Sequence, residues 1–531
     1  MSATSPALSA SRSSRRWRSD VALVAALLFA WLAATAWMRP LMLPDEGRYV
    51  GVAWEMLRSG DWLTPTLDGL PFFHKPPLFY WLTAGAMALA GPHEWAARFA
   101  PMLGGFAEGL ALYLFLRHWS GTARARLALA VLAVQPLFYV GAQFANLDML
   151  VAGCIAATVL CGAHAALCLQ AGRPHRRALW GAYALAALGV LAKGLIGFVI
   201  PALVLAVWLL LLGRWRTVLR LVSGTGAAVF LAVAAPWFIA MHQLHPDFLH
   251  YFFVVQHFQR FAGAGFNNVQ PFWFYPAVLA LCCLPWLPWL RWLGPLAPAK
   301  GRATDPVRVL MVVWAAVVVL FFSLPASKLL GYVLPAMPPL AALIAAGLAQ
   351  ALQQRPQRRR WALAGAGVSL LAGLGLVVGL ALFPPHSGRE LARELAQRHG
   401  AGEPVIALQP YPYDLPFYAR LQAPVVVVED WTRQRAQPRD DWRKELADAA
   451  LFAPQQGART LVQPAALPAL LCGAAVSWLI TGHDGPPPAV LTGARLVHAG
   501  HDATLWQLRL NDPGVAAALG CAALAATPPP R

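Results

Sequence analysis

The chain has 531 residues, of which 58% are hydrophobic and 12% charged, and its mean hydropathy is +0.52. Soluble domains carry roughly 25% charged residues, so the composition excludes an ordinary soluble protein and predicts an integral membrane protein. The net charge of +18 comes largely from arginine clusters in short loops between apolar stretches. That pattern orients membrane helices and suits an anionic inner leaflet, so we expect a lipid bilayer, and no nucleic acid, as partner.

The N-terminus carries several arginines before a long apolar stretch at 21–38. This arrangement resembles a signal peptide. The apolar stretch is, however, longer than the roughly 7–15 residues of a signal-peptide core, and no convincing cleavage site follows it. We interpret it as a retained first helix, preceded by a basic cytoplasmic tail at residues 1–20.

Apolar stretches near the roughly 20 residues that cross a bilayer continue to residue 383. Residues 78–90 are apolar but short, and we interpret them as interfacial or re-entrant. Allowing for hidden spans, we expect about 11 to 13 transmembrane helices. The predicted spans are 21–38, 95–116, 127–144, 149–169, 179–192, 195–212, 218–240, 275–293, 307–323, 330–351 and 361–383.

The arginine clusters predict the topology of these spans. With the N-terminus in the cytoplasm, every dense arginine cluster after the first falls in a cytoplasmic loop. The transmembrane domain at 21–383 then has two long outer loops, 39–94 and 241–274, whose patterns suit helices lying along the membrane surface. Gly60 is expected to end one such helix.

The composition changes near residue 384. A polar helix is predicted at 389–398, followed by short apolar runs typical of buried strands at 405–408, 425–428, 461–462 and 478–480. The predicted fold is therefore an α-helical polytopic membrane protein with a small C-terminal α/β domain outside the membrane, at 384–531. Cys472 and Cys521 lie in this domain and either pair in an oxidising compartment or stay free.

Two aspartates lie at outer ends of predicted spans, where a charge is costly. Asp45 follows the first span, and Asp148 is the only charge between Arg126 and Arg173. Such a carboxylate can act as a base or an electrostatic partner in group transfer. Each could instead be the N-cap of the helix that follows it, a common role for aspartate.

Cations and a phenol accompany these carboxylates in the outer loops. Lys75 follows two aromatic residues and His74 and precedes two prolines; the prolines fix its backbone, and a preset cation suits a phosphate. Lys75 could also simply reach the lipid boundary. Lys328 and Tyr332 place a cation and a phenol beside another outer loop, whereas Lys193 is interpreted as an interface anchor.

His257 and Arg260 are three residues apart and share one face of a predicted helix. Arg260 could clamp a phosphate or contact lipid headgroups, and His257 could face a ligand or metal. His74 and His257 are therefore candidate ligands for a divalent metal, although two imidazoles do not define a metal site.

Taken in order, these segments resemble the GT-C superfamily of polyprenyl-phosphate-sugar transferases. The nearest resemblance is to the lipid A aminoarabinose transferases of bacteria, which are related to the protein O-mannosyltransferases. The matching strings are at 43–49, 60–65, 74–81, 97–99, 146–149, 191–194, 257–261, 270–273 and 327–332. The resemblance is weak over the C-terminal domain.

The resemblance implies a role for each matched position. Asp45 corresponds to the acidic residue of the family's first outer loop, and Asp148 to a second carboxylate. Arg48 and Lys75 correspond to residues near the donor phosphate. The remaining matches, on the donor side of the cavity, are Arg260, Lys328 and Tyr332.

One position departs from the pattern of the family. Relatives often carry glutamate before the Lys-Pro-Pro string, and that glutamate can join a histidine in holding a metal. Here the position is His74. Any metal site would therefore consist of His74 and His257 instead.

The resemblance implies transfer of a sugar, 4-amino-4-deoxy-arabinose or another amino sugar, from undecaprenyl phosphate to lipid A. The reaction would occur at the periplasmic face of the bacterial inner membrane. One alternative is a related transferase acting on protein or another glycan. Another is a transporter or flippase, which should carry polar residues in broken helices near the bilayer midplane. The polar groups here collect at one membrane face, which favours a transferase.

Overall fold

The computed structural model describes residues 6–259, 268–294, 304–409, 411–436, 441–482, 489–512 and 514–521. The chain divides into two compact units. The first consists of Met1–Met38, Arg98–Ala240 and His257–Gly379, and the second of Arg39–Ala97, Met241–Gln256 and Leu380–Arg531. Each unit therefore combines segments that are far apart in the sequence.

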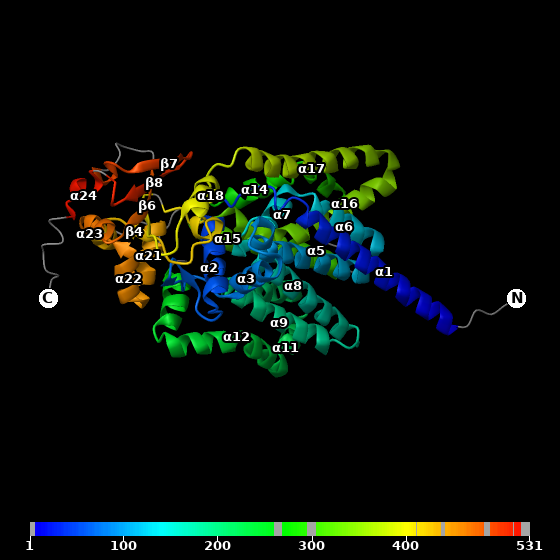
Figure 1. Ribbon diagram of the computed structural model, residues 1–531. Coiled ribbons are helices and arrows are strands. Elements are labelled where there is room, and N and C mark those ends of the chain that lie inside the picture. Colours follow the sequence, from blue (N-terminus) through cyan, green and yellow to red (C-terminus); the bar gives the residue numbers. More distant parts are fainter. Residues whose placement is uncertain are drawn as a thin grey trace. The chain divides into compact units, whose positions relative to one another are not determined.

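The first unit is helical (Figure 1). At its centre α8 (Leu147–Gln170) packs against α5 (Phe99–Trp119) and α9 (Arg176–Lys193), which lie on either side of it. The helices that belong wholly or mainly to this unit are α1 (Pro6–Ala33), α5 (Phe99–Trp119), α6 (Thr122–Ala133), α7 (Pro136–Gly141), α8 (Leu147–Gln170), α9 (Arg176–Lys193), α10 (Ile196–Leu211), α11 (Trp215–Leu221), α12 (Gly224–Leu244), α14 (Phe274–Cys282), η2 (Leu287–Leu293), α15 (Pro306–Ser323), η3 (Leu330–Ala336), α16 (Met337–Gln354), η4 (Pro356–Arg358) and α17 (Arg359–Leu382).

Glycines allow the closest helix approaches in this unit. A Cβ atom added to Gly104 of α5 would lie 2.3 Å from the carbonyl oxygen of Met149. One added to Gly153 of α8 would lie 2.2 Å from the carbonyl oxygen of Gly104. Because no side chain fits between the two backbones, α5 and α8 pack at the short distance that small residues permit in membrane proteins.

Several helices have the length and composition of membrane spans. Among the described residues, six helices are long and apolar enough to cross a membrane, or seven if a bent pair counts as one span. Shorter apolar helices include α10 and α3 (Leu78–Ala90). The chain is thus a multi-span membrane protein, as predicted, while the total of about 11 to 13 spans stays a prediction.

Two spans that were predicted to be continuous are broken. The segment 127–144 is divided into α6 and α7 before Pro136, whose ring cannot continue a regular helix. The segment 275–293 is divided into α14 and η2, which are bent by 96° relative to each other. Pro285 lies at this bend and Pro288 in the first turn of η2, so backbone breaks follow the prolines in both segments.

The second unit surrounds a six-stranded sheet of order β5-β4-β3-β6-β8-β7 (Figure 1). The pairs β5–β4, β4–β3 and β3–β6 are parallel, and the pairs β6–β8 and β8–β7 are antiparallel. The elements that belong wholly or mainly to this unit are α2 (Asp45–Ser59), β1 (Thr66–Leu67), β2 (Leu70–Pro71), α3, α4 (Glu94–Ala97), η1 (His250–Gln259), α18 (Arg389–Arg398), β3 (Val405–Gln409), α19 (Leu415–Tyr418), β4 (Val426–Val428), α20 (Trp431–Ala436), α21 (Trp442–Phe452), α22 (Pro454–Thr460), β5 (Leu461–Val462), η5 (Pro464–Ala466), α23 (Leu467–Cys472), β6 (Val476–Gly482), η6 (Ala489–Leu491), β7 (Arg495–Ala499), β8 (Ala503–Arg509) and α24 (Val515–Ala518).

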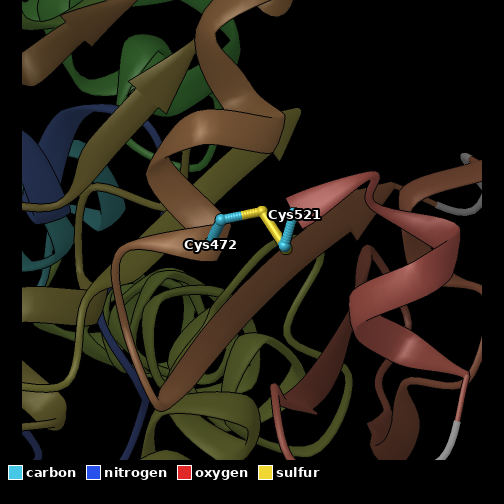
Figure 2. Close-up of a disulfide and its surroundings, with 2 residues drawn as sticks. All are labelled: Cys472 and Cys521. Carbon is cyan, nitrogen blue, oxygen red and sulfur yellow. A yellow bond between two sulfur atoms is a disulfide. The ribbon is translucent and has the colours of Figure 1, made fainter. Parts of the chain in front are cut away.

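The predicted α/β character of the C-terminal region is confirmed. The four apolar runs form β3, β4, β5 and β6, and the predicted polar helix is α18. Ile406, Leu479 and Leu508 are fully buried in the core on one side of the sheet. A disulfide joins Cys472 to Cys521 across a sequence separation of 49 residues (Figure 2), so the two cysteines are paired.

Within this unit, the segment at 39–94 packs onto the C-terminal sheet domain. Asp68, in the turn between β1 and β2, accepts a hydrogen bond from the backbone N–H of Val425 at 2.8 Å. Glu55 of α2 accepts bonds from the backbone N–H groups of Asp68 and Gly69 at 2.6 and 3.0 Å. Burial raises the pKa of both carboxyl groups. Sequence patterns did not identify these contacts, which fix the loop that carries Asp45.

Candidate active site

Asp45 begins α2 and forms an ion pair with Arg48 one turn later, at 2.6 Å. Arg48 also pairs with Glu445 of α21. The N-cap position belongs to Pro44, and no side chain caps this helix, so the N-cap interpretation of Asp45 is wrong. Its side chain is 37% exposed. Asp45 therefore presents a partly accessible carboxylate, oriented by a cation, in the first turn of a helix, where the helix dipole favours negative charge.

The neighbouring Glu46 has a structural role. It is fully buried and pairs with Arg39, which is also buried. Its carboxylate also accepts a hydrogen bond from the backbone N–H of Met42 at 2.9 Å. Burying a charge is costly unless its hydrogen bonds are satisfied. This pair therefore holds the turn from Arg39 to Glu46 and with it the start of α2.

His74 lies in a buried aromatic setting beside Lys75. Its Nε2 atom is 3.0 Å from the hydroxyl of Tyr251 on η1, and its ring stacks on Phe72 at 4.7 Å. Tyr251 also accepts a hydrogen bond from Gln256 at 2.9 Å. Burial raises the pKa of the Tyr251 phenol, so this hydroxyl stays protonated and joins the loop to η1. Lys75 itself is half-buried.

The described residues that contact His74 are not metal ligands. In the described parts of the chain, no group of three or more His, Cys, Asp or Glu side chains could hold a metal ion. The neighbours of His74 are instead a phenol and aromatic rings. The side chain of His257, the other predicted ligand, lies outside the described residues, as does Arg260. A metal site at His74 and His257 therefore stays a prediction.

Asp148 forms the centre of a polar cluster in the first unit. It lies in the first turn of α8 and pairs with Lys193, the last residue of α9. The Lys193 ammonium also lies over the ring of Tyr332, 4.3 Å from its centroid. The α8 N-cap is Asn146, whose side chain accepts the backbone N–H of Asp148 at 3.0 Å. The N-cap interpretation of Asp148 is therefore wrong.

Lys193 was interpreted as an interface anchor, and this interpretation is wrong. Its side chain is only 12% exposed and is committed to Asp148. Gly331 permits the arrangement, because a Cβ atom there would lie 2.0 Å from a carboxylate oxygen of Asp148. The structure thus brings together the predicted Asp148 and Tyr332 and adds Lys193, which the charge pattern alone could not connect to them.

Lys328 is placed differently from the other predicted cations. It is 4% exposed, and its ammonium donates to the backbone carbonyls of Gln270 and Pro325 at 2.9 and 2.5 Å. Burial lowers its pKa. Because its donors engage backbone groups, Lys328 joins two loop segments, 268–270 and 325–328. The structure does not bring it into the contacts of Asp148.

The chain is similar in sequence to known glycosyltransferases. Residues 74–239 match the family model of dolichyl-phosphate-mannose-protein mannosyltransferases. Over 320 residues the chain is 39% identical to undecaprenyl phosphate-alpha-4-amino-4-deoxy-L-arabinose arabinosyl transferase 1 of Sodalis glossinidius. That match covers 58% of this chain and spans 55% of the length of the relative.

Solved structures share the fold over most of the chain. ArnT from Cupriavidus metallidurans, in a crystal structure bound to undecaprenyl phosphate, superposes with a TM-score of 0.76 at 24% identity, covering 92% of this chain and 98% of that one. The archaeal oligosaccharyltransferase AglB from Archaeoglobus fulgidus gives 0.51 at 14% identity, covering 88% and 70%. These identities show the fold alone. The chain is therefore similar in sequence to undecaprenyl phosphate–aminoarabinose arabinosyl transferases and shares the fold of ArnT from Cupriavidus metallidurans.

Proposed function

We propose that this protein transfers a sugar, 4-amino-4-deoxy-arabinose or another amino sugar, from undecaprenyl phosphate to lipid A. The observation that carries the proposal is the Asp148–Lys193–Tyr332 cluster. A committed ion pair at the ends of two apolar helices is expensive and by default functional. The sequence similarity to undecaprenyl phosphate–aminoarabinose arabinosyl transferases supports the choice of donor.

The chemistry requires charge stabilisation at two places. As the bond between the anomeric carbon and the phosphate oxygen breaks, the electron pair leaves with undecaprenyl phosphate and positive charge grows on the sugar. Preset cations stabilise the leaving phosphate, and such electrostatic terms are often the largest in catalysis. Lys75, Arg48 and Arg260 are the proposed donor-phosphate residues. Lys328 and Tyr332 are proposed to shape the donor side of the site.

The two aspartates are proposed to act on the sugar and on the acceptor. Asp45 and Asp148 would stabilise the oxocarbenium-like centre or orient the acceptor oxygen that forms the new bond. A lipid A phosphate is already ionised and has no proton to lose, so Asp45 would then position rather than deprotonate. A hydroxyl acceptor would need a base, and the accessible carboxylate of Asp45 fits that role.

We assign the reaction to the periplasmic face of the bacterial inner membrane. The charge pattern supports this orientation, because the dense arginine clusters after the first fall in the opposite set of loops. The disulfide between Cys472 and Cys521 gives independent support (Figure 2), since disulfides persist in oxidising compartments such as the periplasm. The domain at 384–531 would then be periplasmic.

The direct test is a transfer assay with the full-length protein in lipid vesicles. The donor is undecaprenyl phosphate carrying aminoarabinose, and the acceptors are lipid A, a serine-rich peptide and a neutral glycolipid, each supplied separately. We expect sugar-modified lipid A and an equal amount of free undecaprenyl phosphate. Modification of the peptide or glycolipid instead would transfer the assignment to another acceptor. Movement of intact donor across the bilayer without bond cleavage would indicate a flippase.

A further inference from the structure

The second unit contains a cavity of about 1030 Å³ that the proposed reaction does not use. It lies between the segment 384–391, which enters α18, and the β6, β7 and β8 end of the sheet. Its volume is at the upper end of the roughly 300–1,000 Å³ typical of small-molecule sites. A cavity of this size within one compact unit is large enough for a ligand of several rings.

Two tryptophans give the cavity flat apolar walls. Trp442 begins α21 and Trp506 lies on β8, and both are half-buried. The indole N–H of Trp506 donates to the hydroxyls of Thr481 and Thr504 at 3.2 and 3.0 Å. Those bonds fix the ring in place. Fixed aromatic faces suit the C–H faces of sugar rings, which are apolar, while sugar hydroxyls remain free for hydrogen bonding.

Arg389, in the first turn of α18, supplies a cation whose hydrogen bonds are incomplete. Its side chain is 24% exposed, and its one ion pair among the described residues is a long contact of 3.5 Å with Glu94. Its Nε atom is buried and has no hydrogen-bond partner in the described part of the chain. A guanidinium carries five N–H donors in a fork that fits carboxylate and phosphate, and the partly exposed side chain of Arg389 can offer its terminal N–H groups to an anion.

A histidine lining the same cavity also has an unused nitrogen. The Nε2 atom of His498 on β7 is buried and, within the described ranges, has no hydrogen-bond partner. Most buried polar atoms are hydrogen-bonded, and each exception calls for an explanation such as a bound molecule. Arg389 and His498, which come from different elements, both line this one cavity.

The lining also includes Glu390, which is exposed, and Arg443, which pairs with Glu429 and Asp441. Three further titratable groups at the rim contact one another. Asp502 lies between His386 and His501, whose Nδ1 atoms are 3.1 and 2.9 Å from the same carboxylate oxygen. No group of three or more metal-ligating side chains occurs among the residues that the structure describes. The polar atoms left for a ligand are thus hydrogen-bonding groups, with a cation among them, rather than a metal-ligand set.

We propose that this cavity binds an anionic saccharide, a sugar ring bearing a phosphate or carboxylate. The ring would stack on Trp506, the anionic group would bind the guanidinium of Arg389, and a ring hydroxyl would bond to His498. This site stands on its own residues and holds whatever the outcome for the proposed transferase reaction.

The test measures equilibrium binding to the full-length protein in detergent micelles, by calorimetry or ligand-observed NMR. The probes are glucose 6-phosphate, glucose and inorganic phosphate. We expect glucose 6-phosphate to bind at least about tenfold more tightly than either of the others, since one good charge-assisted bond accounts for that factor. If glucose binds as tightly as glucose 6-phosphate, the site does not recognise an anionic group. If inorganic phosphate binds as tightly, the site does not recognise a sugar ring. Either result would overturn the proposal.

Variants locate the bound probe. Arg389→Gln should weaken glucose 6-phosphate binding about tenfold, while Arg495→Gln, which removes the same charge from an exposed position on β7, should leave it within about twofold. His498→Gln tests a second lining residue and should also weaken glucose 6-phosphate binding, which keeps the test valid if the change at Arg389 causes a folding defect. Thermal unfolding of each variant is measured in parallel. Equal effects of the Arg389 and Arg495 changes would overturn the proposal.

A final variant separates this cavity from the proposed donor site. Lys75→Ala, which removes a proposed donor-phosphate residue, should leave glucose 6-phosphate binding unchanged. If Lys75→Ala abolishes the binding, glucose 6-phosphate occupies the donor site, and the proposal that this cavity binds a saccharide is wrong.

Discussion

Lys193, the last residue of α9, forms an ion pair with Asp148, in the first turn of α8 and 45 residues earlier in the chain. The two side chains are only 12% and 8% exposed. Neither charge would be tolerated there without the other, because an uncompensated buried charge costs several kcal/mol. The pair therefore links the geometry of the proposed site to the stability of the helix bundle.

We expect the single changes Asp148→Asn and Lys193→Gln each to destabilise the protein by about 3–5 kcal/mol, since each leaves the other charge buried alone. The double change should recover most of that loss, because no uncompensated charge remains. Transfer activity should be absent in all three. Thermal unfolding in detergent and the vesicle assay measure the two effects. Additive losses of stability would show that the pair is not coupled, and activity in the double variant would make the pair purely structural.

Asp45→Asn should preserve the shape of α2 and remove only the charge. We expect the transfer rate to fall by at least about 100-fold, the lower range for loss of an acid–base or charge-stabilising group. Membrane insertion should stay normal. The matched control is Glu394→Gln. Glu394 pairs with Arg398 on the same helix, α18, and loss of this partly exposed ion pair should change the transfer rate little. Full activity of Asp45→Asn would remove this carboxylate from the mechanism.

Lys75→Ala should weaken the use of the donor. Loss of a phosphate-binding cation removes a charge-assisted bond, so we expect kcat/KM for the donor to fall by at least about tenfold. Lys75→Arg keeps the charge and should retain more activity than the alanine variant. Initial rates at varied donor concentration provide the measurement. An unchanged rate and donor affinity would reduce Lys75 to an anchor at the lipid boundary.

Asp414 should make the second unit less stable as the pH rises. Burial raises its pKa from 3.8 to about 7, although it accepts hydrogen bonds from Ser387 and the backbone N–H of Gly388. Between about pH 4 and 7 the unfolded chain releases this proton first, so stability falls with pH, and above about pH 7 the whole penalty is present. Asp414→Asn keeps an acceptor and removes the charge.

We therefore expect Asp414→Asn to raise the unfolding temperature near pH 8 and to change it little near pH 4. Thermal unfolding of both proteins across this range gives the comparison. An equal shift at both pH values would show that the effect comes from altered packing. A lower unfolding temperature near pH 8 would contradict the assignment of a raised pKa.

The sequence predicted helix ends and buried strands where a single residue or a short apolar run determines them. Gly60 ends α2 in a left-handed conformation, with φ of 73°, as its lack of a side chain suggested. The apolar runs that became β3, β4 and β6 were also recognisable, because parallel strands buried on both faces read as continuous hydrophobic stretches. The β7 and β8 strands were missed. β7, which includes Arg495, is an edge strand with mostly exposed or half-buried residues, so it carries no such run.

Contacts between distant segments could not be predicted. The residue types at positions 45, 48 and 148 suggested chemistry, but nothing local connected Arg48 to Glu445, which lies 397 residues away. The two aspartates looked equally suitable as N-caps, and only the backbone geometry assigned that position to Pro44 in one helix and to Asn146 in the other. Tertiary packing decided these roles.

The central claim is that lipid A receives the sugar, and mass spectrometry of lipid A tests it most directly. The host is a bacterium that makes undecaprenyl-phosphate aminoarabinose but lacks its own transferase, and it expresses either this protein or its Asp45→Asn variant. The account predicts that lipid A gains the mass of one amino sugar on a phosphate with the unaltered protein only. Unmodified lipid A, with the donor present and the protein correctly inserted in the membrane, would contradict it.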